Sequence, residues 1–335
     1  MASVVGRDAE LSVLDGALGA ERDGGAVILV GGPGIGKSTL WEAAVRSARG
    51  RGVRVLLARP SASEARLAFA GLIDLCDRLE PEALAVLPPP QRAALEAALL
   101  RAEAVGKPIA SAAIAVGFLG VVRALAAHRR VLIALDDLPS LDSPSEEVLA
   151  FAARRLEGVD VRFLLARRPG RAGGLERELA VGLQRLTVGP LSLGAVRQLL
   201  FDRLGLSVTR QLMRRIMQAT DGNPLFALEI GRSLVEHGAP SLGAEVPLPD
   251  SLEEMLGIRV ARLSAPLRRV LLALALSEPL SAEQVTAVAG RVAVEDAVDA
   301  GVVLIDGQHV RASHPLLAAA VVKHSRAREP RELHL

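Results

Sequence analysis

The chain has 335 residues, of which 50% are hydrophobic and 23% charged, a composition typical of a globular protein rather than a disordered one. The net charge is only +2 and 2% of the residues are aromatic, so composition argues against a strong nucleic-acid footprint. The single cysteine, Cys76, allows no intrachain disulfide, and no apolar stretch is long enough to predict a membrane span. We therefore expect a cytoplasmic protein of two or three domains without membrane contacts.

Strand-like apolar runs alternate with helical patterns from the N-terminus to about residue 190, which predicts a parallel α/β sheet. The candidate strands are 27–30, 53–57, 131–135, 161–165 and 186–188.

The first of these strands is followed by the loop Gly31–Ser38, which has the pattern G-x-x-x-x-G-K-S, and then by a helical pattern over 38–48. Strand, loop and helix in this order predict a phosphate-binding loop, in which backbone N–H groups and the helix N-terminus hold phosphate oxygens. Lys37 would reach the β- and γ-phosphates, and Ser38 would hold Mg²⁺. A dinucleotide site is disfavoured because Lys37 stands where that motif needs glycine. The predicted nucleotide contacts here are Gly32, Pro33, Gly34, Ile35, Gly36, Lys37, Ser38 and Thr39.

The apolar run 131–135 ends in Asp136 and Asp137. In phosphate-loop proteins such a strand lies beside the first one, so we expect Asp136 to hold Mg²⁺. Asp137 would orient or deprotonate the attacking water. Without the upstream loop, a helix cap or a solvated turn would be the favoured interpretation of the two acids.

The strand 161–165 is followed by Arg167 and Arg168. A cation at this sheet edge could sense a γ-phosphate, and Arg167 is the candidate. A solvated basic turn is an equally good interpretation in a chain with so many arginines, and the sequence does not decide between the two arginines.

The strand signals stop after residue 190. Helical patterns follow at 193–204, 209–219 and 224–237, then a linker rich in proline and glycine at 238–249 and a helix that begins near 252. Three short helices and a hairpin (302–306 and 309–312) come next and predict a winged helix. The predicted domains are an α/β nucleotide-binding domain (1–189), a helical lid (190–237), a linker with a connecting helix (238–263) and a winged-helix domain (264–335).

Four further segments carry a family resemblance. Val5–Leu11 looks like a G-R-x-x-E-L opening, Phe69–Leu72 like a segment after the second strand, Thr220–Glu229 like a G-N-P-L-F motif, and Ser313–Leu316 like an H-P-L motif. With the phosphate loop, they resemble the STAND class of signal-transduction ATPases, above all the nucleotide-binding module of large LuxR-family (MalT-like) bacterial transcriptional regulators.

The resemblance implies a switch that binds ATP or ADP with Mg²⁺ and hydrolyses ATP slowly at most. It places Val5, Gly6 and Arg7 near the adenine, Pro224 against the base, and His314 against the β-phosphate of ADP. An unknown inducer or partner protein and nucleotide-dependent self-association would complete the switch. Without the motif, His314 would be interpreted as a packed or solvated histidine.

Two features depart from the family pattern. The run after the paired acids, 138–142, lacks the usual tryptophan, and the chain ends at Leu335 within a helical pattern. The ending predicts a truncated piece or a shortened relative without an output domain.

Three other classes fit the sequence less well. An AAA+ ATPase of the replication-initiator type would also join an ATPase to a winged helix, but the segment 294–299, where DNA-contacting residues would lie, is acidic. We therefore expect no direct DNA binding. A small-molecule kinase would not need the extra domains, and a vigorous motor would more usually carry glutamate in place of Asp137.

Overall fold

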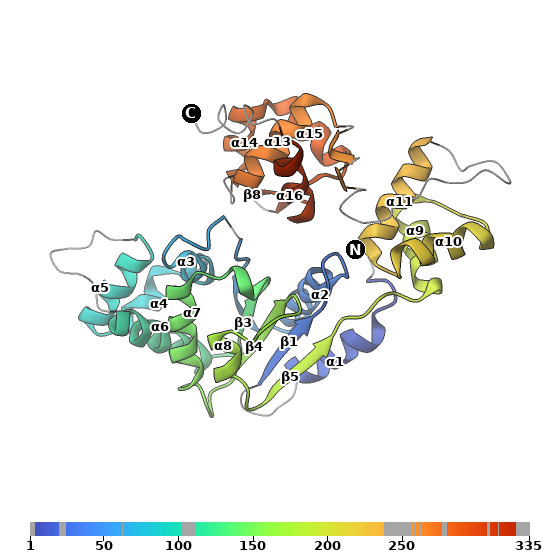
Figure 1. The fold of residues 1–335 in the computed structure, drawn as a ribbon. Helices are drawn as coiled ribbons and strands as arrows, with labels where there is room; N and C mark the ends of the chain where they lie inside the picture. Colours follow the sequence, from blue (N-terminus) through green and yellow to red (C-terminus); the bar gives the residue numbers. More distant parts are fainter. Residues whose placement is uncertain are drawn as a thin grey trace. The chain divides into compact units, whose positions relative to one another are not determined.

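The computed structural model describes residues 4–19, 25–61, 63–101, 111–237, 256–257, 259–261, 263–276, 280–306, 309–313 and 315–325. The chain forms two compact units, Met1–Gly189 and Pro190–Leu335. Figure 1 shows the elements of both units in chain order.

The first unit is built on a five-stranded sheet with the order β2-β3-β4-β1-β5, in which all neighbours are parallel. The strands are β1 (Ala26–Val30), β2 (Arg54–Ala58), β3 (Val131–Leu135), β4 (Val161–Arg167) and β5 (Leu183–Thr187). The parallel α/β sheet predicted from alternating strand and helix patterns is thereby confirmed, and with the phosphate loop predicted after the first strand it is the fold of a P-loop NTPase.

One prediction about this sheet is wrong. The strand that ends in Asp136 was expected beside the first strand, but β3 pairs with β2 and β4, and β4 lies between β3 and β1. Because β4 is buried along its whole length, its two arginines included, it can occupy a central position. Asp136 still reaches the phosphate loop, since all these strands end at the same edge of the sheet.

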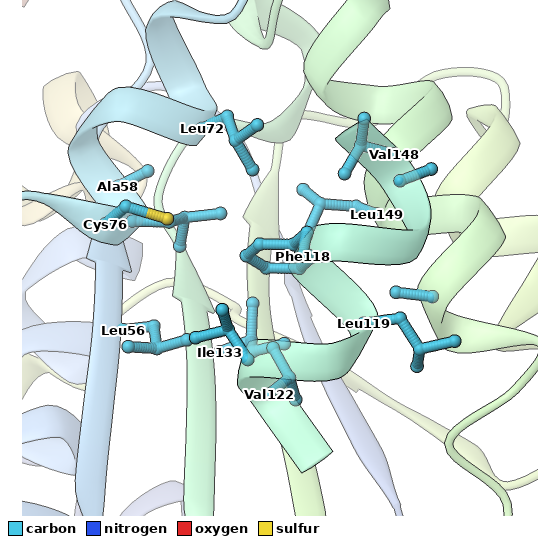
Figure 2. Close-up of a cluster of buried hydrophobic side chains, with 14 of the residues drawn as sticks. Leu56, Ala58, Leu72, Cys76, Phe118, Leu119, Val122, Ile133, Val148 and Leu149 are labelled. Carbon is cyan, nitrogen blue, oxygen red and sulfur yellow. The ribbon is translucent and has the colours of Figure 1, made fainter. Parts of the chain in front are cut away.

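Helices cover both faces of the sheet, and alternate residues of each strand point into one layer or the other. Ile133 and Leu135 of β3 belong to the layer under α3 (Ala70–Cys76), α5 (Pro89–Ala98), α6 (Ser111–Ala126) and α7 (Ser143–Ala153). Leu132 and Ala134 belong to the layer under α1 (Asp8–Gly19) and α2 (Lys37–Gly50). Figure 2 shows the first layer, with Phe118 of α6 among aliphatic side chains from the strands and α7. Burial on both faces explains why β1 and β3 are continuous apolar runs.

The helices of the first unit follow the strands in a βα pattern (Figure 1). They are α1 (Asp8–Gly19), α2 (Lys37–Gly50), α3 (Ala70–Cys76), α4 (Pro81–Ala85), α5 (Pro89–Ala98), α6 (Ser111–Ala126), the 3-10 turn η1 (Leu138–Ser140), α7 (Ser143–Ala153) and α8 (Gly174–Glu178).

The second unit begins with three helices, α9 (Leu193–Leu204), α10 (Arg210–Thr220) and α11 (Pro224–His237). Its later part has three-stranded antiparallel pairing in the order β6-β8-β7. The elements there are α13 (Ala265–Leu276), β6 (Leu280–Ser281), α14 (Ala282–Ala289), α15 (Arg291–Asp299), β7 (Val303–Asp306), β8 (His309–Ala312) and α16 (Pro315–His324). The predicted linker 238–249 and the start of the helix near 252 lie outside the described residues.

Within the described ranges, no helix combines the length and the apolar character that crossing a membrane requires.

Candidate functional site

The phosphate loop lies between β1 and α2, as its sequence pattern predicts. Gly34 and Gly36 have φ angles of 72° and 101°, in the left-handed region that glycine adopts without strain. Gly36 precedes α2 without a side-chain cap, and the first turn of α2 contains no acidic residue. The N–H groups of this turn are therefore not satisfied by a capping side chain, and the helix N-terminus suits an anion such as phosphate.

Lys37 is held over the loop, because its Nζ donates a hydrogen bond of 2.9 Å to the carbonyl oxygen of Gly32. Burial lowers the pKa of Lys37 from its ordinary value, and the positive charge of Arg168 lowers it further, whereas the charges of Asp136 and Asp137 raise it. The ammonium thus has two carboxylates and one guanidinium within electrostatic reach. A phosphate group would add the negative charge that favours the protonated lysine.

Asp136 follows β3 directly, and its carboxylate accepts a hydrogen bond from the Ser38 side chain. Burial raises the pKa of Asp136, while the Ser38 hydroxyl and the Arg59 charge oppose this rise. A hydroxyl and a carboxylate in contact are the oxygen donors that Mg²⁺ prefers, so this pair fits the metal. Among the described residues no group of three or more His, Cys, Asp and Glu could hold a metal ion. Phosphate oxygens and water would therefore supply its remaining ligands.

Asp137 occupies an unusual backbone conformation at the start of η1. Its φ is 60°, which few residues other than glycine adopt and which is common at functional sites. The Oγ of Ser140 donates a hydrogen bond of 2.9 Å to its carboxylate. Asp137 is thus fixed beside Asp136 in one orientation, as a residue that positions water should be.

The opening motif lies beneath the loop. The buried guanidinium of Arg7 donates to the carbonyl oxygens of Ile35 (2.9 Å) and Gly189 (2.7 Å), and its other nitrogen pairs with Glu10 at 2.7 Å. Arg7 therefore supports the loop from behind and ties it to the last residue of the first unit. The predicted adenine contacts of Val5, Gly6 and Arg7 stay predictions.

Arg167, the predicted γ-phosphate sensor, has protein partners in the structure. Its side chain is buried and forms a two-bond ion pair with buried Glu176, at 2.7 and 3.1 Å. Its third nitrogen donates to the carbonyl oxygens of Arg168 and Gly170. The guanidinium thus fastens the end of β4 to α8, because a charged group on a fully buried strand needs such a partner. Arg168, which is exposed and acts on Lys37, is better placed to meet a phosphate.

Sequence reasoning missed Arg59. It directly follows β2, and its guanidinium pairs with Glu42 of α2 at 3.1 Å and lies 5.5 Å from the centre of the Trp41 ring. The signal was available, since the rule that located Asp136, a polar residue at the carboxyl end of a strand, also selects Arg59.

The remaining predicted residues are in the second unit. Pro224 is the first residue of α11, and the side chain of Asn223 accepts hydrogen bonds from the N–H groups of Leu225 and Phe226. Gly222 has a φ of 68°, and a Cβ there would come within 2.4 Å of the Leu191 carbonyl oxygen. The G-N-P pattern therefore has a structural reason, because it forms the start of α11. His314 lies outside the described residues.

Comparisons with known proteins agree with this geometry. Residues 3–165 match the family model of the AAA ATPase domain. A solved STAND protein with a tetratricopeptide repeat sensor, from Pyrococcus horikoshii, superposes with a TM-score of 0.57 at 17% sequence identity. The match covers 100% of this chain and 44% of that one, so the chain spans less than half of its structural relative.

Two further structures match with lower scores. A Walker-type ATPase of Pyrococcus abyssi has a TM-score of 0.47 at 15% identity, covering 95% of this chain and 96% of that one. The replication initiator DnaA bound to AMPPCP and single-stranded DNA has a TM-score of 0.44 at 14% identity, with 86% and 77% covered. No curated protein sequence matches significantly. The family match and the STAND structure together support a P-loop ATPase.

Proposed function

We propose that this chain is an adenine-nucleotide switch of the STAND type, which binds ATP or ADP with Mg²⁺ and hydrolyses ATP slowly. The observation that carries the proposal is the phosphate loop, where Lys37 and the uncapped start of α2 adjoin the Ser38–Asp136 pair. Cationic, amide and oxygen ligands thereby converge on one end of the sheet, as binding a nucleotide phosphate chain with its metal requires.

Each residue of the first unit has a distinct role in this proposal. Backbone N–H groups of the loop hold the phosphate oxygens, and Lys37 leaves the Gly32 carbonyl to meet the β- and γ-phosphates. Ser38 and Asp136 would hold Mg²⁺, which when bound neutralises charge on the phosphate oxygens. Asp137 orients the attacking water, and Arg168 meets the γ-phosphate.

The regulatory part of the proposal rests on the sequence motifs. Three helices and a three-stranded antiparallel sheet in the second unit support a winged helix there. Its helix α15 exposes Glu295, Asp296 and Asp299, which would repel DNA phosphates, so a role in relaying a signal fits better than DNA binding. The finer proposal is therefore a cytoplasmic transcription-regulating switch that responds to an inducer. Pro224 and His314 stay predicted nucleotide contacts.

Calorimetric titration with ATP and ADP tests the proposal. Lys37→Ala should weaken binding at least about tenfold, because a charge-assisted contact to phosphate contributes about 1.5–3 kcal/mol. Lys323→Ala, which removes an exposed lysine of α16, is the matched control and should bind like the parent chain. Equal affinity of the Lys37→Ala variant and the parent would refute the site assignment.

A further inference from the structure

Arg59 and Asp136 leave the sheet side by side. Ala58 and Leu135, the last residues of β2 and β3, are paired in register, and the N–H of Asp136 donates a hydrogen bond of 3.2 Å to the Ala58 carbonyl oxygen. The next residue on β2 is Arg59, and the next on β3 is Asp136. A fixed positive charge therefore stands on the strand adjacent to the carboxylate proposed to hold Mg²⁺.

The Arg59 side chain is held in this place by the helix that carries the phosphate loop. Its Nη2 donates to Glu42 at 3.1 Å, and its guanidinium carbon lies 5.5 Å from the centre of the Trp41 ring. Glu42 is four residues after Ser38, so both lie on one face of α2. The backbone N–H of Arg59 also donates to the Asp74 carboxylate of α3. The side chain is thus held by Glu42 and Trp41 of α2, and the backbone of Arg59 is held by α3.

The charge of Arg59 acts on the metal-binding carboxylate itself. The positive charge of Arg59 and the Ser38 hydroxyl favour the charged carboxylate of Asp136, whereas the charges of Asp137 and Glu42 oppose it. Asp136 therefore has a resident counter-charge before any metal is bound.

We propose that Arg59 is a built-in counter-ion at the metal end of the nucleotide site, and that it makes nucleotide binding less dependent on Mg²⁺. This inference rests on the proposed function. A fixed cation repels a divalent metal next to it and attracts the phosphate charge, so it weakens Mg²⁺ binding and strengthens metal-free binding. Both effects reduce the difference between the nucleotide affinity with Mg²⁺ and the nucleotide affinity without it. Arg59 would thereby let a diphosphate remain bound when its metal leaves.

The test measures the dissociation constant of ADP with Mg²⁺ and with a chelator in place of Mg²⁺, by calorimetry. The ratio of the chelator value to the Mg²⁺ value should rise about tenfold or more in Arg59→Gln and Arg59→Met, which remove the charge. Arg59→Met keeps an apolar stem over Trp41, so it serves where the glutamine variant folds poorly. Arg59→Lys keeps the charge and should retain the parent ratio.

A second readout uses Trp41, the only tryptophan of the chain. Its fluorescence follows a Mg²⁺ titration of the ADP-bound protein, and the midpoint should move to lower Mg²⁺ concentration in both neutral variants. An unchanged ratio and midpoint in these variants, or an equal change in Arg59→Lys, would overturn the inference. When the inference is overturned in this way and Lys37→Ala still loses ADP binding, the proposed function stands and only the role of Arg59 is refuted. If Lys37→Ala binds ADP like the parent, the proposed function itself falls.

Discussion

The segment after the paired acids is anchored by one buried carboxylate, and its removal gives the sharpest stability prediction. Asp142 is 3% exposed and begins α7. Its Oδ1 accepts from the N–H groups of Phe69 (2.8 Å) and Ser145 (3.0 Å), and its Oδ2 accepts from the N–H of Gly71 at 2.9 Å. The side chain thereby joins the first turn of α7 to the start of α3.

The size of the effect follows from these three bonds. Asp142→Ala leaves three N–H donors without their acceptor, and each buried donor left unsatisfied costs about 1–3 kcal/mol. We expect a loss of about 3–9 kcal/mol in the free energy of unfolding of the first unit. Asp142→Asn keeps an oxygen for Phe69 and Ser145 but presents its amide to the N–H of Gly71, so about 1–3 kcal/mol is expected. Ser145→Ala removes the acceptor of the Leu72 N–H and should fall in the same range.

Urea unfolding followed by Trp41 fluorescence measures these differences, because the only tryptophan lies in the first unit. Asp77→Ala is the control: Asp77 is an exposed acid at the end of α3, and its loss should change stability by less than about 0.5 kcal/mol. Asp142→Ala should lose the most stability, Asp142→Asn and Ser145→Ala should lose less, and the control should lose the least. If Asp142→Ala were as stable as the control, the carboxylate would not anchor this segment.

Two further predictions concern turnover and the second unit. An aspartate held by Ser140 stands where the water-positioning residue is expected, so steady-state phosphate release should stay well below the roughly 10 s⁻¹ typical of enzymes. The Lys37→Ala variant serves as the negative control. Fast turnover by the parent chain would favour a motor. Buried Glu229 of α11 pairs with Arg232 and with Arg259, which also donates to the Ala300 carbonyl oxygen. Glu229→Ala should therefore destabilise the second unit by about 2 kcal/mol, measured by thermal unfolding in far-ultraviolet circular dichroism. An unfolding curve like the parent's would show that this carboxylate does not hold the two arginines in a stabilising contact.

Much of the fold could be predicted because the central strands β1, β3 and β4 are buried, so that their apolar residues stand out in the sequence. The five predicted strands match the five observed ones with shifted ends. The strand order could not be predicted in the same way. The position of β4 between β3 and β1 depends on which strands pair, and an apolar run on its own carries no information about its neighbours.

Side-chain partners explain which of the predicted site residues the structure brings together and which it does not. Lys37, Ser38 and Asp136 were identified by motif and position, and the structure brings them together. Arg167 and Arg168 look alike in sequence, and only the ion pair with Glu176 separates them. Glu176 follows nine residues later on a short helix that no pattern in the sequence singled out. Arg59 was missed although its position directly after β2 follows the same rule that located Asp136.

The backbone at Asp137 links the anchored segment to the site. A left-handed conformation at a residue other than glycine costs about 1–3 kcal/mol, and it persists only where the surroundings hold it. On one side Asp137 is continuous with β3, which is buried along its whole length. On the other side η1 leads directly to Asp142, whose three hydrogen bonds fix the chain to α3 and α7. A turn fixed at both ends cannot relax freely when a γ-phosphate arrives or leaves. A change in charge at Asp136 and Asp137 would therefore be passed to α3 and α7 rather than absorbed locally, which is what the proposed switch function requires.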